Sequence, residues 1–285
     1  MTTIIRAVVM VLALVITKAN AQDFQGVATY KTQRSIDIKI DSTKMSSEMH
    51  QKMMDMMKKQ FQKTFNLTFN KEESTYKEEE SLEKPTVGGG NFQVMVVGAG
   101  GGSDILYKNT KEDRYADQRD AMGKIFLVKD DIKKIDWKLG SESKHIGEYL
   151  CYKATYTKEV EKPRVIVDTD DSESSEEELD KEPEMETITV TAWYTPQIPV
   201  NNGPGMYQGL PGLILEIHDG KLNIICSKIV LNPEDKVEIK EPTKGKEVNQ
   251  EKYDKIMEKK AQEMMERYRP RNGRHGESIE ISIGG

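Results

Sequence analysis

A stretch rich in glycine and proline separates two strand-like segments in the second half of the chain. Residues 187–194 have the β-branched and aromatic composition of a strand, which must end at Pro196 and Pro199. A second apolar run begins at Leu213 and continues to Ile217. Proline fixes φ and removes a backbone donor, whereas glycine permits positive φ. The residues between the two strands are therefore expected to follow one defined irregular path.

Short runs with strand composition recur along the rest of the chain. Residues 24–40 alternate between apolar and polar side chains, which predicts a half-buried strand. Hairpins are expected over Asn70-Lys71 and over Asp219-Gly220. Further strands are predicted at 105–108, 114–118, 124–128, 133–139, 147–160, 221–231 and 237–239. Spacings of about eight to twelve residues between runs are typical of all-β domains.

Two segments have helical periodicity. Residues 43–64 contain no glycine or proline, and a methionine stripe recurs along them at helical spacing, from Met45 to Met57. Residues 249–267 show a second helical pattern. The predicted fold is therefore mainly β, within the β-rich α+β class. We expect a curved antiparallel sheet or half-barrel with an amphipathic helix, residues 43–64, packed against it.

The composition combines few apolar residues with many charged ones. Hydrophobic residues make up 36% of the 285 residues, charged residues make up 32%, and the net charge is −6. Solvated segments within an ordinary domain account for this balance. Residues 86–103 are glycine-rich at both ends and read as an exposed loop or insertion, and an acidic insertion is expected at 165–186. A net negative chain lacks the basic face that nucleic acid or anionic lipid requires.

The N-terminus has the features of a secretory signal peptide. Arg6 precedes a short apolar segment, and Ala19-Asn20-Ala21 is a cleavage signature before Gln22. We expect residues 1–21 to be removed and the mature protein to be periplasmic or secreted, without a transmembrane segment. The predicted organisation is a single β-rich domain at 22–245, followed by a C-terminal helix and flexible tail at 246–285.

The chain contains two cysteines, Cys151 and Cys226, both within strand-like runs. An even pair in an oxidising compartment favours a disulfide. Two buried free thiols are the alternative, since cysteine also packs as a small apolar residue.

Methionine is the most unusual feature, with 15 residues in the chain. Met49, His50, Met53 and Met57 share one face of the expected helix, and thioether ligands favour Cu(I). Methionine also fills cores and adaptable apolar grooves. The sequence therefore leaves three roles open for this face, namely core packing, a ligand groove and a copper site.

The stretch between the two strands supplies the other candidate binding residues. Trp193 and Tyr207, together with Trp137, belong to an aromatic set of the kind that lines recognition surfaces. Leu210 and Pro211 lie at the centre of the glycine- and proline-rich path. Packing beneath that path is the alternative role for Trp193. The path itself suits either a structural clasp or a docking surface.

No catalytic motif is present. The four histidines, at 50, 145, 218 and 275, lie far apart and outside any nucleophile, metalloprotease or Cys-His signature. The acidic segment lacks the glycine and terminal glutamate of an EF-hand loop, and residues 98–103 lack the lysine of a phosphate loop. We therefore predict no catalytic residues, no cofactor and no metal site in the main interpretation.

The segment Gly209-Leu210-Pro211-Gly212-Leu213-Ile214, preceded by Trp-Tyr-Thr-Pro at 193–196, resembles the GLPGLI family of exported proteins from Bacteroidetes-type bacteria. The resemblance implies export but no biochemical activity. The predicted function is an exported, non-enzymatic binding protein of the cell envelope that offers an apolar groove to a lipid, peptide or protein partner. A periplasmic copper-binding protein is the alternative.

Overall fold

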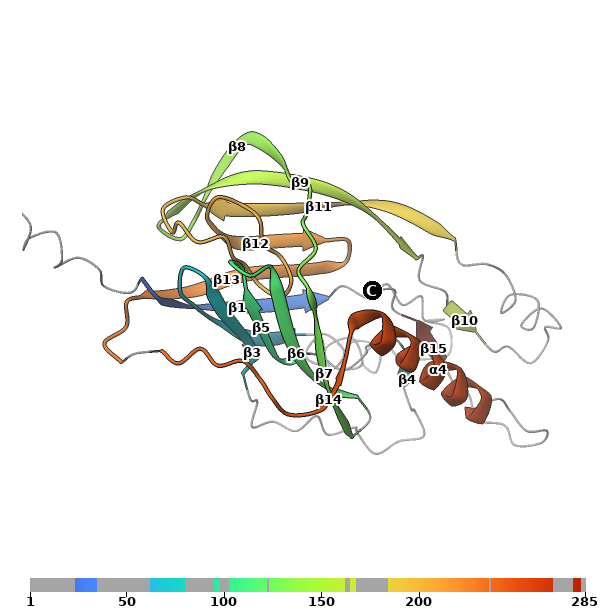
Figure 1. Ribbon diagram of the computed structural model, residues 1–285. Coiled ribbons are helices and arrows are strands. Elements are labelled where there is room, and N and C mark those ends of the chain that lie inside the picture. Colours follow the sequence, from blue (N-terminus) through green and yellow to red (C-terminus); the bar gives the residue numbers. More distant parts are fainter. Residues whose placement is uncertain are drawn as a thin grey trace, which may run out of the picture.

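The computed structural model shows a strongly curved β-sheet with a helix against it (Figure 1). Twelve strands in the described part of the chain pair in the order β14-β7-β6-β5-β3-β2-β1-β13-β12-β11-β9-β8. The prediction of a mainly β fold with a helix packed against the sheet is confirmed, although the helix described there is residues 250–268 and not the expected residues 43–64. The structure describes residues 24–34, 62–79, 95–97, 103–121, 123–161, 165–167, 184–235, 237–268 and 279–282.

The strands of the large sheet are β1 (Gly26–Arg34), β2 (Gln62–Phe69), β3 (Glu73–Glu78), β5 (Ser103–Asn109), β6 (Arg114–Ala121), β7 (Lys124–Asp131), β8 (Lys138–Ile146), β9 (Tyr149–Glu161), β11 (Met185–Thr195), β12 (Leu213–Asp219), β13 (Leu222–Leu231) and β14 (Lys246–Val248). Neighbours pair antiparallel, except that β14 runs parallel to β7. The expectation of a purely antiparallel sheet is corrected at this edge. The reason is that β14 follows a long covering segment and not a hairpin.

The two hairpins predicted from turn residues are confirmed. Between β2 and β3, the Asn70 side-chain oxygen accepts hydrogen bonds from the backbone N–H groups of Glu72 and Glu73, at 2.8 and 2.7 Å. Between β12 and β13, Gly220 takes a φ of +57°, and Asp219 pairs with Leu222. Asparagine and glycine both favour such turns, so these local signals were sufficient.

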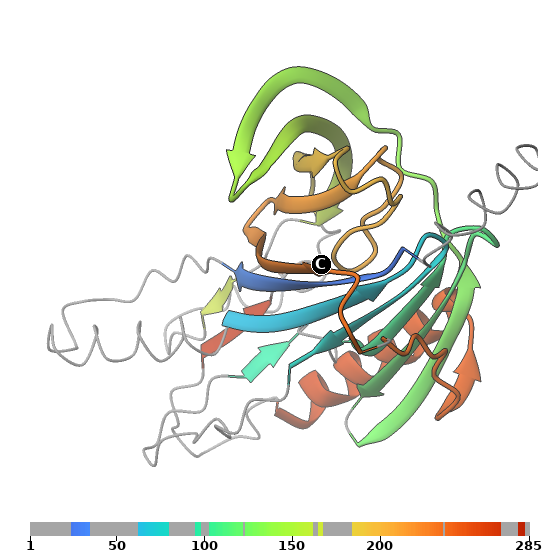
Figure 2. The ribbon, with the colours of Figure 1, turned by 90° about the vertical axis from the view of Figure 1, so that its left-hand side faces the viewer.

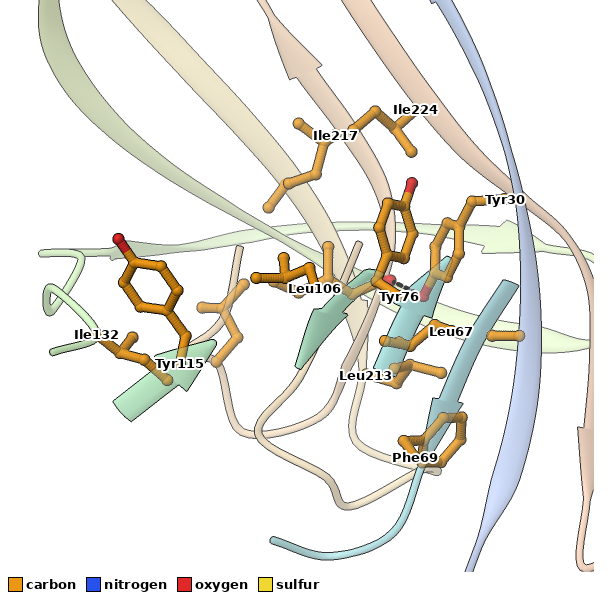
Figure 3. Close-up of a cluster of buried hydrophobic side chains, with 14 of the residues drawn as sticks. Tyr30, Leu67, Phe69, Tyr76, Leu106, Tyr115, Ile132, Leu213, Ile217 and Ile224 are labelled. Atoms are coloured by element: carbon orange, nitrogen blue, oxygen red, sulfur yellow. Dashed lines mark hydrogen bonds between the residues drawn. The ribbon is translucent and has the colours of Figure 1, made fainter. Parts of the chain in front are cut away.

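The main core lies on one face of the sheet, called the inner face below. Alternate residues of the central strands point into it, and Figure 3 shows the cluster around Tyr30, Leu67, Tyr76, Leu106 and Leu213. This one cluster also draws residues from β7, β9 and β11. A flat sheet cannot bring such distant strands into a single core. The sheet therefore curves around its inner face, as Figure 2 shows.

A smaller core lies on the opposite, outer face. Tyr107, Ala116 and Leu127 are buried there against Ile239. Residues 237–239 were predicted to form a strand, but no strand is present at that position. The segment covers the sheet through the side chain of Ile239 and has no backbone ladder with a neighbouring strand, so the strand prediction is wrong.

Helix α4 (Gln250–Tyr268) packs against β7. Tyr253 is buried, and its ring lies edge-on to Phe126 with 5.6 Å between centroids. The helix begins where Asp130 accepts a hydrogen bond from the backbone of Gln250, at 3.0 Å. The second helical pattern in the sequence is thus confirmed. Beyond residue 245, β14 pairs with β7 and α4 packs against it. The domain boundary expected at residue 245 stays a prediction.

Two element predictions near the sheet need correction. The methionine-rich helix was expected to continue to residue 64, but residues 62–64 belong to β2, where Thr64 pairs with Lys31. The remaining residues of that expected helix, 43–61, lie outside the described residues. The strand expected at 133–139 is absent until β8 begins at Lys138. The preceding segment is irregular because Ile132 and Trp137 turn toward the core instead of alternating.

A second, three-stranded sheet joins segments that are far apart in the sequence. It consists of β10 (Val165–Val167), β15 (Ile279–Ser282) and β4 (Met95–Val97), in that order. The glycine-rich segment at 86–103 was expected to be a loop or insertion, yet β4 gives it a strand. Likewise β15 gives a strand to the expected flexible tail. Both depend on partners that local sequence cannot reveal.

Candidate functional site

The glycine- and proline-rich connection between β11 and β12, residues 196–212, is called the loop below. It begins where Pro196 ends the β11 ladder, because proline has no N–H to donate. The first residues of β12 then bind back to the loop. The backbone of Leu213 donates to the carbonyl of Ile198 at 2.9 Å, and that of Ile214 donates to Asn202 at 3.0 Å. The path predicted from glycine and proline is therefore ordered by backbone hydrogen bonds.

Two glycines of the motif are required for different reasons. A Cβ on Gly212 would lie 2.2 Å from the carbonyl oxygen of Thr195, so no side chain fits there. Gly209 has a φ of +98°, a conformation that residues with a Cβ rarely adopt. Its N–H donates to the side-chain oxygen of Asn201. Glycine is thus needed sterically at one position and conformationally at the other.

The apolar residues of the motif are anchors in the main core. Leu210, Leu213 and Ile214 are each no more than 1% exposed. Below them, the Tyr30 hydroxyl on β1 donates to the carbonyl oxygen of Ile214 at 2.7 Å. The motif is therefore built into the core at its apolar positions, as the structural-clasp alternative requires. The loop occupies the inner face of the sheet, between the β11–β12 end and β5.

Three side chains from other elements bind polar groups of the loop. Lys108 on β5 donates from Nζ to the carbonyl oxygens of Gly203 at 3.0 Å and Tyr207 at 3.3 Å. Trp137 donates from its indole N–H to the carbonyl oxygen of Gln208 at 2.8 Å. The Tyr207 hydroxyl donates to Asp219. The loop is therefore held at its middle as well as at its ends.

Lys108 has an unusual environment for a lysine. It is completely buried, and no carboxylate is among the partners of its amine in the described part of the chain. Burial lowers the pKa of Lys108 from 10.5 to about 7, because an apolar environment disfavours the charged form. A neutral amine carries two N–H donors, which matches the two loop carbonyls that it binds.

Asp219 links the loop to the β12–β13 hairpin. Its carboxylate accepts the hydroxyl of Tyr207 and forms an ion pair with Lys158 of β9 at 2.7 Å. Burial, followed by the nearby Asp219 charge, raises the pKa of Tyr207 well above its usual value. The hydroxyl therefore stays a donor at any ordinary pH. Asp219, judged from sequence as an ordinary turn residue, is in fact a contact of the site.

The outward side of the loop is exposed and carries no charge. Its exposed residues include Pro196, Gln197, Pro199, Asn201, Met206 and Pro211, which are called the exposed loop face below. Residues 187–215 contain no Asp, Glu, Lys or Arg, although 32% of the whole chain is charged. Depletion of charge distinguishes the centres of protein interfaces from ordinary surface. The exposed loop face is therefore an uncharged surface in a chain that is otherwise rich in charge.

Trp193 belongs to a separate polar group beside the loop. The Lys144 ammonium of β8 lies 4.4 Å from the centroid of its indole ring and forms an ion pair with Glu216 of β12 at 2.7 Å. His218 also contacts that carboxylate. In a flat sheet, three strand steps would separate β8 from β12 by roughly 14 Å. The ion pair therefore depends on the strong curvature of this end of the sheet.

The two cysteines are free thiols in the structure. Cys151 is buried in the main core and Cys226 packs at its edge. Burial raises the pKa of Cys151 to about 11 and, with a smaller effect of the Cys151 thiolate, raises the pKa of Cys226 to about 12. Both thiols are therefore protonated and unreactive at neutral pH. The disulfide expected between them stays a prediction.

The structure places the predicted binding residues in different environments. Pro211 is exposed, Tyr207 and Trp193 are half-buried, and Leu210 is an inaccessible core anchor. Met53 and Met57, with the proposed copper ligands Met49 and His50, lie outside the described residues. Sequence reasoning missed Lys108. The alternation of side chains along a strand could have identified it, because Lys108 follows the inward-facing Leu106 by two positions and so points to the same face.

Two further features bear on the class of site. Across the described ranges, no group of three or more histidine, cysteine or acidic side chains is arranged to hold a metal ion. In the same part of the chain, no helix has the length and apolar character required to cross a membrane.

The chain matches a family described as a protein of unknown function (Porph_ging) over residues 137–216. This match fits the family resemblance inferred from the motif, without confirming the GLPGLI name. It starts at Trp137 and ends at Glu216, and so includes the whole loop and Trp137, one of the three side chains from other elements that bind it. No curated protein matched the sequence.

Two solved structures of PNGF-II are similar to the chain. The one in space group C2 has a TM-score of 0.46 and 13% identity over 83% of this chain. The one in space group P21 has a TM-score of 0.45 and 14% identity over 82% of this chain. The chain spans 33% of the length of either structure.

Proposed function

We propose that the protein is an exported, non-enzymatic binding protein of the cell envelope, and that it captures a protein partner on the exposed loop face. The observation that carries the proposal is an uncharged exposed surface on a rigidly held loop. A surface that is already ordered loses little conformational entropy when a partner binds. Binding residues also commonly occur on loops that a rigid scaffold positions.

The chemistry of the exposed loop face favours an uncharged, partly apolar partner surface. Met206 is 38% exposed, and methionine adapts to differently shaped apolar partners. Pro199 and Pro211 add rigid apolar area at no cost in side-chain entropy. A charged partner surface would be desolvated here without any compensating ion pair. The apolar groove expected beside the methionine-rich helix involves residues outside the described part and stays a prediction.

The test is site-specific photo-crosslinking in the native cell. A photoreactive residue replaces Met206 or Pro211. A matched control replaces Lys244, which is exposed in the segment between β13 and β14. We expect one discrete adduct from positions 206 and 211 and none from position 244. Adducts of equal yield from all three positions, or from none, would contradict the proposal.

A charge substitution sharpens the same test. Met206→Asp places a carboxylate within the uncharged surface, and Lys244→Asp is its control. With the photoreactive residue at 211, we expect Met206→Asp to reduce the adduct at least about tenfold, which corresponds to 1.4 kcal/mol. The unfolding midpoints of both variants should match wild type, since surface changes alter stability by about 0.5 kcal/mol or less.

Export is proposed from the N-terminal sequence, which lies outside the described residues. The mature protein should begin at Gln22. N-terminal sequencing of material from the envelope fraction or the medium tests this. A mature chain that starts before residue 19, or that remains in the cytoplasm, would contradict export and with it the proposed location of the partner.

A further inference from the structure

The loop contains a short turn at residues 203–207 whose two ends are bound by the same side chain. The backbone of Tyr207 donates to Pro204 across the turn at 3.2 Å. The Lys108 amine binds the carbonyl oxygens at both ends, Gly203 and Tyr207. Met206, on the exposed loop face, lies between those ends. The lysine thus holds the base of the turn that presents the methionine.

Among the described residues, no carboxylate is a hydrogen-bond partner of this lysine. Its cross-strand neighbours are Ser74 on β3 and Tyr115 on β6. The Ser74 hydroxyl is uncharged, and the Tyr115 hydroxyl donates to Gln250 on α4. Other titratable groups on that face include Asp117, whose Oδ2 pairs with Arg119 at 2.6 Å, Tyr207, whose hydroxyl binds Asp219, and the tyrosines Tyr30 and Tyr76. The amine therefore depends on the two loop carbonyls for its hydrogen bonds.

The two protonation states of Lys108 fit this environment differently. The neutral amine has two N–H donors for two carbonyls. The ammonium ion has a third donor, together with a positive charge that the apolar surroundings do not solvate. Protonation in place therefore favours any rearrangement that brings the amine closer to water, and such a rearrangement changes its hydrogen bonds to the two ends of the 203–207 turn.

We propose that Lys108 is the positioning residue of the exposed loop face: its buried amine holds the two ends of the 203–207 turn, and its protonation changes how the turn presents Met206. This inference rests on the proposed function for its biological meaning, because it adds a pH response to that surface. Its geometry concerns only the loop and is tested without a partner.

The experiment follows the loop by NMR as pH changes. The chain contains two tryptophans, and the Trp137 indole N–H is bonded to Gln208, beside the turn. We expect the Trp137 indole signal and the Met206 methyl signal to shift together between pH 6 and 9, with a midpoint near 7, the value to which burial lowers the pKa of Lys108. In Lys108→Met this transition should be lost. In the matched control Lys144→Met it should remain.

If the Lys108→Met variant does not fold, a second measurement on the wild-type protein tests the same inference. The side-chain carbon signal of Lys108 should titrate with the same midpoint as Trp137. A Lys108 signal that titrates near 10.5, or a Trp137 signal that does not follow it, would overturn the inference, as would an unchanged pH response in Lys108→Met. Crosslinking at Met206 is scored separately, so a missing partner leaves the NMR result intact and refutes the proposed function alone.

Discussion

The loop and the neighbouring β8–β9 arch, residues 138–161, are held in place by different forces. The loop is uncharged, and it is fixed by buried apolar side chains such as Ile198 and Leu210 and by backbone hydrogen bonds within the loop and from the start of β12. The arch is mostly exposed along β8, and ion pairs such as Lys144–Glu216 and Lys153–Glu142 contribute to its position. The stabilisation from buried apolar contacts depends on how well the side chains fit and changes little with screening by salt. The stabilisation from exposed ion pairs is weakened by salt. We therefore expect the loop to respond to changes of shape and the arch to changes of charge.

The largest effect is expected from a side chain at Gly212. Gly212→Val places a Cβ 2.2 Å from the backbone oxygen of Thr195, so the backbone itself must shift. We expect a loss of at least about 3 kcal/mol in the free energy of unfolding, at or above the usual range for overpacking. Chemical denaturation measures this. In the arch, a substitution at the exposed Ser141 should change stability by no more than about 0.5 kcal/mol.

A matched pair of leucines compares burial directly. Leu213 is 0% exposed where the loop meets β12, and Leu139 is 61% exposed on β8. Leu213→Ala should cost about 2–5 kcal/mol, the range for buried leucines. Leu139→Ala should fall within about 0.5 kcal/mol of wild type. Equal unfolding midpoints for Leu213→Ala and wild type would end the interpretation of the motif as a structural clasp.

The pH dependence of stability distinguishes Lys108, which holds the loop, from Lys144 on the arch. The pKa of Lys108 is about 7 when folded and 10.5 when exposed, so the unfolded chain binds the extra proton between these values. The free energy of unfolding should therefore rise with pH above 7, by up to about 1.4 kcal/mol per unit. The raised pKa values of Cys151 and Cys226 act in the opposite direction above 9.

The measurement is therefore a set of denaturation curves between pH 7 and 9, in wild type and in Lys108→Met. The rise should be present in the first and absent in the second. Lys144→Met, on the arch, should retain it. A wild type without any rise across this range would mean that Lys108 is solvated, contrary to its burial.

The smallest effects are expected from the ion pairs of the arch. Lys144→Met leaves Glu216, which is nearly buried, without its ammonium partner and should cost about 1–3 kcal/mol. Lys153→Met breaks a more exposed pair with Glu142 and should cost no more than about 1 kcal/mol. Repeating both in 1 M salt should shrink the second cost further. A larger cost at Lys153 than at Lys144 would reverse this ranking.

Local patterns predicted much of the sheet. Period-two alternation identified β1, strand composition identified β9, and turn residues located the hairpins at Asn70 and Gly220, because these features act over a few residues. The failures share a different cause. Residues 133–137 have strand-like composition, but Trp137 is drawn to the carbonyl of Gln208, 71 residues away. Residues 237–239 contact the sheet by a side chain without joining it.

The candidate site divides in the same way. Proline and glycine at 196–212 determined that β11 must stop and that the path must be irregular, since both act on the backbone of their own residues. The apolar run from Leu213 predicted the strand that follows. Tertiary structure alone decided which groups meet the loop. Lys108, Trp137 and Asp219 come from separate elements, and sheet curvature brings them together. Lysine is ordinarily solvated. Only the curved tertiary fold buries Lys108, lowers its pKa and gives its amine two backbone carbonyls as partners.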